Sequence, residues 1–249
     1  MALNFFLRML LGHLVGDFIL QPYKIAVAKR AGWRGLLLHV SIVTFTTGVA
    51  LYQVVPDWLF WTGVLFVVHL FIDQFRTYIF TDNSKGKSFF FFVLDQIVHV
   101  ISLMIISNLA VGWQFSDLAP IFTSLPMERV DTMLLFSCIL IVAIWVVPIL
   151  EVELATAIIS RQTKTEEKLL VPIRRSDRLW GGIERLSSVI LILISHSFSL
   201  LIPLIFLPRL FWLFKEDVAP NKVAIYSKTG TSFITAIVIS VPLWLLTLL

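Results

Sequence analysis

The sequence predicts an all-α polytopic membrane protein, a bundle of about six to eight membrane helices with its N-terminus outside. Of the 249 residues, 58% are hydrophobic and 14% are charged, and the mean hydropathy is +0.90. A soluble domain could not solvate such a surface, and apolar runs long enough to cross a bilayer recur along the whole chain. Short fragments of His and Asp interrupt these runs, and the functional interpretation depends on them.

The expected spans follow from the apolar runs and the residues that end them. The first covers about 3–20 and stops at Gln21-Pro22, since a proline just beyond a helix marks its end. The other expected spans lie at about 35–54, 58–80, 89–111, 132–150 (able to continue to 160) and 232–249. Residues 183–214 are too long for one ordinary span and contain Pro203 and Pro208, so either a re-entrant hairpin or one kinked helix fits them.

Loop charge predicts the orientation of the chain. The connectors after the first, third and fifth spans are basic, and those after the second and fourth carry net acid. By the positive-inside rule the basic connectors are cytoplasmic, which leaves the N-terminus outside. We interpret the most basic stretch, 161–185, as a cytoplasmic loop against anionic membrane lipids. Lys and Arg are thereby explained as topology signals, and we expect no nucleic-acid patch.

Four fragments carry the candidate site: His13-x-x-x-Asp17, the lone His39, His69-x-x-x-Asp73 and Asp95-x-x-x-His99. Residues four apart on a helix share one face, so three helices each present an imidazole with a carboxylate. An Asp in mid-span costs roughly 2.5–3.5 kcal/mol on insertion scales, so these carboxylates need partners, and a shared metal ion supplies them. The predicted metal ligands are His13, Asp17, His39, His69, Asp73, Asp95 and His99.

The expected topology places all of these groups in the cytoplasmic half of the bilayer. At about 1.5 Å per residue, the shallower layer consists of Asp17, His39, Asp73 and Asp95. About one turn deeper lie His13, His69 and His99. The order within the pairs also inverts as the helix direction does: His precedes Asp in the inward-running helices, and Asp precedes His in the outward-running one. Scattered polar residues would not agree in depth and order.

Imidazole and carboxylate are ligands for zinc, and equally for iron or manganese. The candidates exceed what one tetrahedral ion needs, so either two divalent ions bind, or one binds while the remaining groups orient ligands and act as a general base. We favour zinc and assign catalytic roles to His39, Asp73 and Asp95. The predicted function is an intramembrane metal-dependent hydrolase acting on a lipid-like or membrane-presented substrate at the cytoplasmic side.

Other polar residues flank the predicted site, and each has a simpler interpretation. Residues that could hold an anionic headgroup, or only anchor the topology, are Arg34, Arg76, Lys85 and Lys87. Residues that could orient ligands, or only form surface or interhelical hydrogen bonds, are Gln21, Gln74 and Gln96. His196, between two serines, is interpreted as a local hydrogen-bonding residue, and Glu184-Arg185 as an interfacial ion pair.

Two other functional classes remain open. Pumps and transporters use chains of intramembrane Asp and His, so the cluster also fits a cation or proton transporter. Against this alternative, the candidates share one depth and the outer half of these helices offers no continuing polar file. In the other alternative the His–Asp pairs only join helices by hydrogen bonds. The chain would then be a membrane partner or regulatory protein whose basic loop 161–185 contacts a protein or nucleic acid.

Motifs in the first half of the chain resemble a known family. Leu11–Gln21, Leu36–His39, His69–Asp73 and Leu94–His99 resemble the bacterial membrane family catalogued as domain of unknown function 3307. The resemblance covers roughly the first 110 residues and extends loosely to Gly182–Leu186. It implies a multi-pass protein of the bacterial inner (cytoplasmic) membrane, similar to membrane-bound His/Asp metal-dependent hydrolases. It supports the fold and the metal site and leaves the substrate open.

We therefore divide the chain into four parts. They are a four-helix metal-site core (1–111), a connector with the fifth helix (112–160), a basic cytoplasmic loop (161–182) and C-terminal membrane helices (183–249). The single cysteine, Cys138, excludes an intrachain disulfide and any metal site built from several cysteines.

Overall fold

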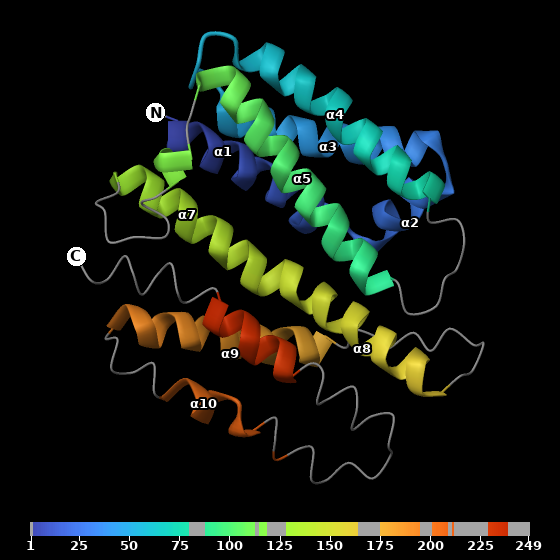
Figure 1. The fold of residues 1–249 in the computed structure, drawn as a ribbon, viewed down its shortest axis with the longest axis vertical. Helices are drawn as coiled ribbons and strands as arrows, with labels where there is room; N and C mark the ends of the chain where they lie inside the picture. Colours follow the sequence, from blue (N-terminus) through green and yellow to red (C-terminus); the bar gives the residue numbers. More distant parts are fainter. Residues whose placement is uncertain are drawn as a thin grey trace. The chain divides into compact units, whose positions relative to one another are not determined.

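The computed structural model describes residues 2–79, 88–112, 115–118, 128–163, 175–194, 201–208, 211 and 229–238. All regular elements in these ranges are helices, as the sequence predicts (Figure 1). Five helices are long and apolar enough to cross a membrane: Ala2–Ile19, Trp33–Leu51, Trp58–Thr77, Phe89–Val111 and Arg129–Ile158. The protein is therefore a helical membrane protein. The predicted residues Lys85, Lys87 and His196 lie outside the described ranges.

The first predicted span is present, with an irregular turn that the sequence does not reveal. Helix α1 (Ala2–Leu14) continues as the π-helix η1 (Val15–Ile19), which the backbone N–H of Leu20 closes by donating to Val15 O at 2.9 Å. Single π-turns inside α-helices are frequent at functional sites. Here the π-turn contains Asp17, one of the predicted metal ligands.

A short helix, α2 (Tyr23–Ala31), follows directly, where the sequence suggested only a basic connector. It begins after Pro22, whose extended backbone suits the residue before a first helical turn. None of its residues is buried. A Cβ atom added at Gly35 would lie 2.0 Å from Ala28 O, so only glycine lets α2 approach the next helix this closely. Helix α2 is thus fixed against the start of α3 (Trp33–Leu51).

The first helix packs tightly against α3 because two glycines face it. A Cβ atom at Gly12 would lie 2.5 Å from Thr47 Cα, and one at Gly16 would lie 2.5 Å from Val43 Cα. Small residues spaced by four allow this backbone approach between membrane helices. The hydroxyl of Thr46 adds a hydrogen bond to Gly12 O at 2.8 Å. Since His13 and Asp17 directly follow the glycines, this packing brings both toward α3.

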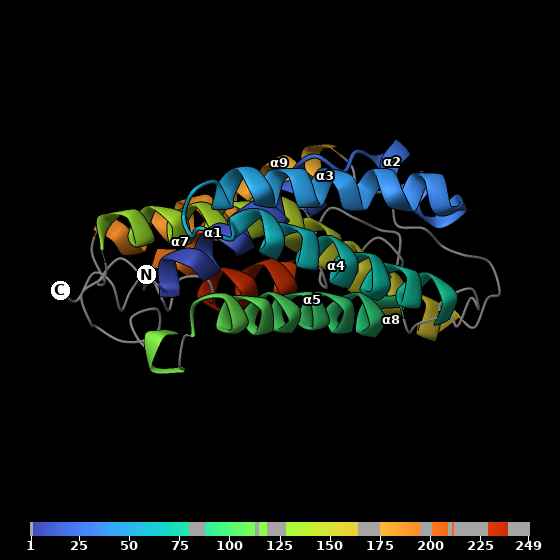
Figure 2. The same cartoon turned by 90° about the horizontal axis from the view of Figure 1, so that it is seen from above.

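One compact unit comprises Met1–Asn83, Leu94–Ala119 and Met127–Ile141. It contains α1 to α4, most of α5 and also α7; the bounds of the elements not yet given are α4 (Trp58–Ile79), α5 (Ser88–Val111), η2 (Phe115–Leu118) and α7 (Arg129–Ile141). Helices α3 and α4 run alongside each other (Figure 2). The Asn4 amide of α1 donates to Asp131 Oδ1 of α7 at 2.5 Å. The bounds of α4, α5 and α7 show that the third, fourth and fifth spans begin close to their predicted limits.

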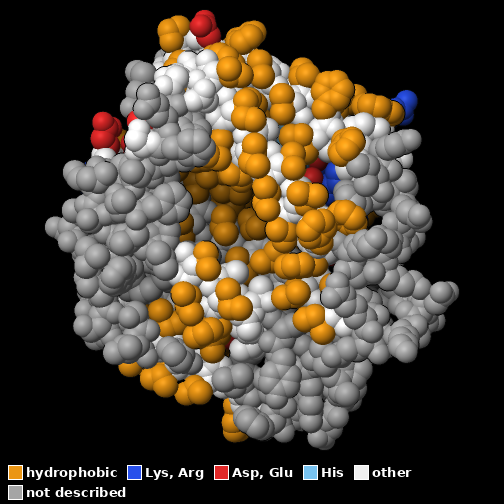
Figure 3. Space-filling view, viewed as in Figure 1, with side chains coloured by type: hydrophobic (Ala, Val, Ile, Leu, Met, Phe, Trp, Pro, Cys, Tyr) orange, Lys and Arg blue, Asp and Glu red, His pale blue; other side chains and the backbone are white. Residues whose placement is uncertain are grey.

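Large apolar side chains point outward from this unit. Phe45, Phe71 and Phe75 are 71%, 69% and 66% exposed. Figure 3 shows hydrophobic side chains over much of the described surface on the face drawn, and few charged ones. In a membrane protein such a surface faces lipid tails, while the polar groups of the spans turn inward.

The second compact unit comprises Ser84–Val93, Pro120–Pro126 and Val142–Leu249. Its described elements are η3 (Val142–Val146), α8 (Val147–Thr163), α9 (Arg175–Ile194), α10 (Ile202–Ile205) and the helix Thr229–Val238. The helix that begins with α7 thus continues past 150, as predicted, while α9 begins inside the stretch expected to be a loop.

A buried arginine joins the helices of the second unit. Arg185 Nε donates to Ala143 O at 2.6 Å, and its guanidinium donates to Glu151 Oε1 at 2.6 Å and to Ser232 Oγ at 2.8 Å. The carbonyl of Ala143 belongs to a π-helix. Glu184 and Arg185, expected to pair at the interface, are both buried, and the ion pair of Arg185 is with Glu151.

Replacing Gly16 by Ala should destabilise the first unit, because the new Cβ would overlap the α3 backbone at Val43. We expect the thermal unfolding midpoint in detergent to fall by about 5 °C or more. Gly63 on α4 is the matched control, since a Cβ there meets no atom within 4 Å. Gly63→Ala should leave the midpoint unchanged or slightly higher. Equal midpoints for both variants would contradict the close approach of η1 to α3.

Candidate metal centre

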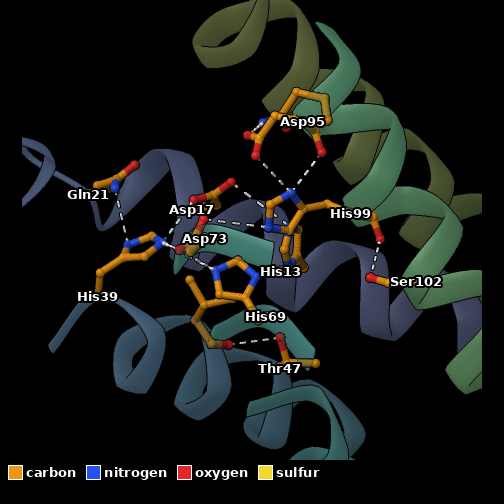
Figure 4. Close-up of polar contacts among 12 residues, drawn as sticks. His13, Asp17, Gln21, His39, Thr47, His69, Asp73, Asp95, His99 and Ser102 are labelled. Carbon is orange, nitrogen blue, oxygen red and sulfur yellow. Dashed lines mark hydrogen bonds and ion pairs between the residues drawn. The ribbon is translucent and has the colours of Figure 1, made fainter. Parts of the chain in front are cut away.

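The seven predicted ligands converge on one buried cluster inside the first unit (Figure 4). They come from four stretches of the chain: α1 with η1, α3, α4 and α5. Each is at most 7% exposed: His13, Asp17, His39, His69, Asp73, Asp95 and His99. Helices bring them together because each i, i+4 pair projects from one helix face toward the other helices.

His39 occupies the centre of one half of the cluster. Its Nε2 atom is 3.2 Å from Asp17 Oδ1 and 3.2 Å from Asp73 Oδ2. The same nitrogen is 3.2 Å from His69 Nε2. A lone imidazole, with no partner of its own on α3, thus connects η1 with α4.

Asp73 lies between the two halves of the cluster. Its Oδ2 atom is also 3.3 Å from His69 Nε2, and its Oδ1 atom is 3.7 Å from His99 Nε2. His99 Nδ1 is in turn 3.7 Å from Asp95 Oδ1. Each oxygen of the Asp73 carboxylate therefore faces a different set of nitrogen atoms.

Three imidazoles that the sequence predicts to share one layer lie close together. The ring centroids of His13 and His69 are 5.0 Å apart, those of His13 and His99 are 5.2 Å apart, and those of His69 and His99 are 4.6 Å apart. These rings come from three different helices. The expected grouping of these three rings is thus present, the ring centroids of His39 and His69 are also 5.4 Å apart, and the depth order stays a prediction.

His99 shows which nitrogen is available to an ion. Its Nδ1–H donates to the Asp95 backbone carbonyl at 2.8 Å, so Nε2 carries the lone pair of the neutral ring. That atom is buried and has no hydrogen-bond partner among the described residues. The same holds for both ring nitrogens of His13, for His69 Nδ1 and for Asp95 Oδ1. Each such atom costs about 1–3 kcal/mol when left unsatisfied, and a bound cation would remove this cost.

Three flanking residues hold ligands in place. Gln21 Nε2 is 3.1 Å from His39 Nδ1, which turns His39 Nε2 toward the cluster. Arg76 donates to Asp95 Oδ2 at 2.7 Å, and Gln96 Nε2 donates to the same oxygen at 3.0 Å. Asp95 Oδ1 is thereby left to face His99. Of the other residues suggested from sequence, Arg34 is exposed and Gln74 is half-buried.

Lys29 also belongs to the cluster, although we expected it, like the other basic residues of its connector, to be only a topology signal. Its Nζ atom is 2.7 Å from Asp73 Oδ1 and 3.2 Å from His39 Nε2. Its side chain is 10% exposed. The sequence shows that the segment after Pro22 is basic, but charge alone does not tell which lysine turns inward.

The donor atoms form three groups that could each hold a metal ion, with ligand atoms within 4.8 Å of one another. These groups are His13–His69–His99, Asp17–His39–His69 and Asp73–Asp95–His99. The second and third share no residue, so the cluster has donors for two ions. With neutral imidazoles, three carboxylates face two cationic side chains, Lys29 and Arg76, in the described part of the chain. One negative charge stays uncompensated, which also suits a cation.

Comparison with known proteins supports the resemblance seen in the motifs. Residues 5–125 match the family model described as "Protein of unknown function (DUF3307)". The matched region includes all seven cluster residues together with Lys29 and Arg76. No curated protein and no solved structure matches the chain. The match therefore supports a relationship for this region and gives no reaction.

If the cluster holds metal, the purified protein should take up one or two zinc ions per chain. His69→Ala and Asp73→Ala should each lose most of this zinc, because both residues contact donors of two ligand groups. Metal content after dialysis, measured by mass spectrometry, tests this. Asp57→Asn, in the exposed turn between α3 and α4, is the control and should keep full zinc content. Equal zinc content in all variants would exclude these residues as ligands.

Proposed function

We propose that this protein is an intramembrane metal-dependent hydrolase acting on a lipid-like or membrane-presented substrate. The observation that carries the proposal is the buried convergence of His and Asp donors, several of which, among them His99 Nε2, His13 Nε2 and Asp95 Oδ1, have no hydrogen-bond partner in the described structure. Polar glue between helices would pair these atoms with each other. Buried donor atoms that lie close together without hydrogen-bond partners suit bound ions.

Two zinc ions fit the donor set better than one. The groups Asp17–His39–His69 and Asp73–Asp95–His99 are independent, and Asp73 faces both through its two oxygens. Asp73 would therefore help to hold both ions, which together would supply the water activation of two-metal hydrolases. His13 completes the imidazole layer and would add a further ligand to either ion.

When bound, a divalent ion polarises the scissile bond and makes water acidic enough to attack near neutral pH. The proton of the attacking water goes to Asp95 Oδ1, which is buried and unpaired while Arg76 and Gln96 hold the other oxygen. Asp95 then returns this proton to the leaving oxygen of the substrate as the scissile bond breaks. His39 and Asp73, surrounded by other donors, hold the ions in place.

The surroundings of the cluster favour a substrate that arrives from lipid. Phe71 and Phe75, on either side of Asp73 in α4, point away from the unit and are among its most exposed side chains. A membrane-embedded substrate could therefore meet apolar surface within one helical turn of a ligand residue. The cytoplasmic location of this surface and the bacterial inner membrane follow from the loop charges and the family resemblance, and both stay predictions.

The proposal predicts zinc-dependent hydrolysis in proteoliposomes, measured with a panel of fluorescent ester and phosphodiester lipids. Asp95→Asn should lower kcat by about 100-fold or more, because the amide cannot take up a proton, while the ion at Asp17–His39–His69 stays bound. Chelator should abolish turnover, and added zinc should restore it. Asp57→Asn serves as the control with unchanged turnover. Hydrolysis that persists in zinc-free protein, or full activity in Asp95→Asn, would refute the proposal.

A cation or proton transporter stays the second candidate because of polar groups near the other end of α1. Asp131 is buried and accepts from Asn4, and Arg8 Nε donates to Asn4 Oδ1 at 2.8 Å. Asn4 and Arg8 lie in the early half of the first span, where the sequence suggested no continuing polar file, and Asp131 faces them from α7. A transporter would need them to continue the path from His13 outward.

Transport predicts a pH- or ion-driven flux in proteoliposomes that Asp131→Asn reduces at least several-fold. The hydrolase proposal predicts no flux, and lipid turnover unchanged in Asp131→Asn, because Asp131 lies outside the ligand cluster. Fluorescent pH and ion dyes inside the vesicles measure the flux. Flux without turnover would favour transport over hydrolysis.

A further inference from the structure

Helix α2 places the ammonium of one lysine, Lys29, in the cluster, whereas its other cationic side chains lie outside the cluster. Lys24 and Arg30 on the same helix are exposed, whereas Lys29 reaches the buried Asp73 carboxylate. Ordering so long a side chain costs conformational entropy. Attraction between the ammonium and the Asp73 carboxylate, 2.7 Å apart, offsets this cost.

The ammonium occupies a position that a metal ion would need. It contacts one atom from each independent ligand group, His39 Nε2 and Asp73 Oδ1. An ion coordinated by both atoms would require the space that the ammonium now occupies. Positive charges within a few ångströms of each other also repel strongly where water is scarce. Lys29 and a divalent ion therefore exclude each other from these two atoms.

The close contact between α2 and α3 limits where a displaced ammonium can move. Gly35 holds the α2 backbone against α3 at Ala28, one residue before Lys29. Only the flexible methylene stem is then free to move, so the ammonium stays at the edge of the cluster. One divalent ion also exceeds the single negative charge that the carboxylates, Lys29 and Arg76 leave uncompensated. The loaded cluster is thus net positive and attracts an anionic group.

The surface of α2 suits the level of lipid headgroups. Tyr23 is 83% exposed and Val27 is 47% exposed, beside the exposed cations Lys24 and Arg30. A helix with apolar and basic exposed residues and no buried ones is typical of the membrane interface. Lipid phosphates lie at this level, and a lysine ammonium binds phosphate as a compact point charge.

We propose that a metal ion displaces Lys29 from Asp73 and His39, and that the released ammonium then binds a phosphate group of the substrate. This inference rests on the metal centre proposed above and adds a substrate class, a phosphate-bearing molecule. The phosphate belongs either to a lipid headgroup or to a free phosphate compound. Lys29 thereby acts as a substrate-binding residue that also occupies the ion site until metal arrives.

Zinc titration of the full chain in detergent micelles tests the displacement. Lys29→Met keeps the length of the side chain but removes the ammonium, so zinc should bind about tenfold more tightly than in wild type. Lys24→Met, exposed on the same helix, should leave zinc affinity unchanged. Lys29→Gln is a second variant should Lys29→Met not purify as a folded protein. Equal zinc affinity in Lys29→Met, Lys29→Gln and wild type would overturn the displacement.

Binding of phosphate probes to the zinc-loaded protein tests the second step. Calorimetry with inorganic phosphate and with dihexanoylphosphatidic acid should give affinities about tenfold weaker in Lys29→Met. Lys29→Arg, which keeps the charge, should retain affinity within about threefold of wild type. Binding of both probes would assign recognition to the phosphate alone, and binding of only the lipid probe would assign it to a headgroup.

Two outcomes separate this inference from the function on which it rests. If wild type binds zinc but Lys29→Met binds both probes as wild type does, the substrate role of Lys29 is wrong and the metal centre stands. If wild type binds no divalent ion, the metal centre and this inference both fail.

Discussion

Three carboxylates buried among apolar helices are the constraint on which the first unit depends. Asp17, Asp73 and Asp95 are each at most 7% exposed, and charge inside a membrane protein must be paired or coordinated. Lys29 and Arg76 supply part of the compensation, each through one carboxylate. The imidazoles then surround the remaining oxygens, and the helices are held at the separations that these contacts need. Fold and site are therefore parts of one electrostatic arrangement.

The spans and the cluster could be predicted because both follow from regular helix geometry. Apolar length predicts a span, and the four-residue spacing of His13 and Asp17, or of His69 and Asp73, predicts a shared face. Helix direction then predicts that the imidazoles of His13, His69 and His99 group together, as their ring distances show.

The features that could not be predicted depend on local packing or on the third dimension. Helix α2 is short and buries nothing, so no apolar period marks it. The contact of α2 with Gly35 determines which basic residue points inward. Composition cannot show that this residue is Lys29. The buried pair of Arg185 with Glu151 likewise joins residues far apart in the sequence, whereas Glu184 beside Arg185 suggested a local pair.

Each unit, considered alone, has a π-helix where a buried charged side chain meets the backbone. A π-turn accommodates Asp17 in η1, and the carbonyl of Ala143, within the π-helix η3, accepts from the buried Arg185. In both places the widened turn departs from the α-helical hydrogen-bond pattern where a charged side chain must be satisfied. The turn in η1 also determines in which direction its side chains point around the helix axis. An ordinary α-helix advances about 100° per residue, so removing one residue from this turn would leave a span of almost the same length and hydrophobicity. Asp17, however, would lose its present position in the turn and its approach to His39. A chain shortened there could still insert as a membrane helix while the Asp17 carboxylate faced away from the other ligands.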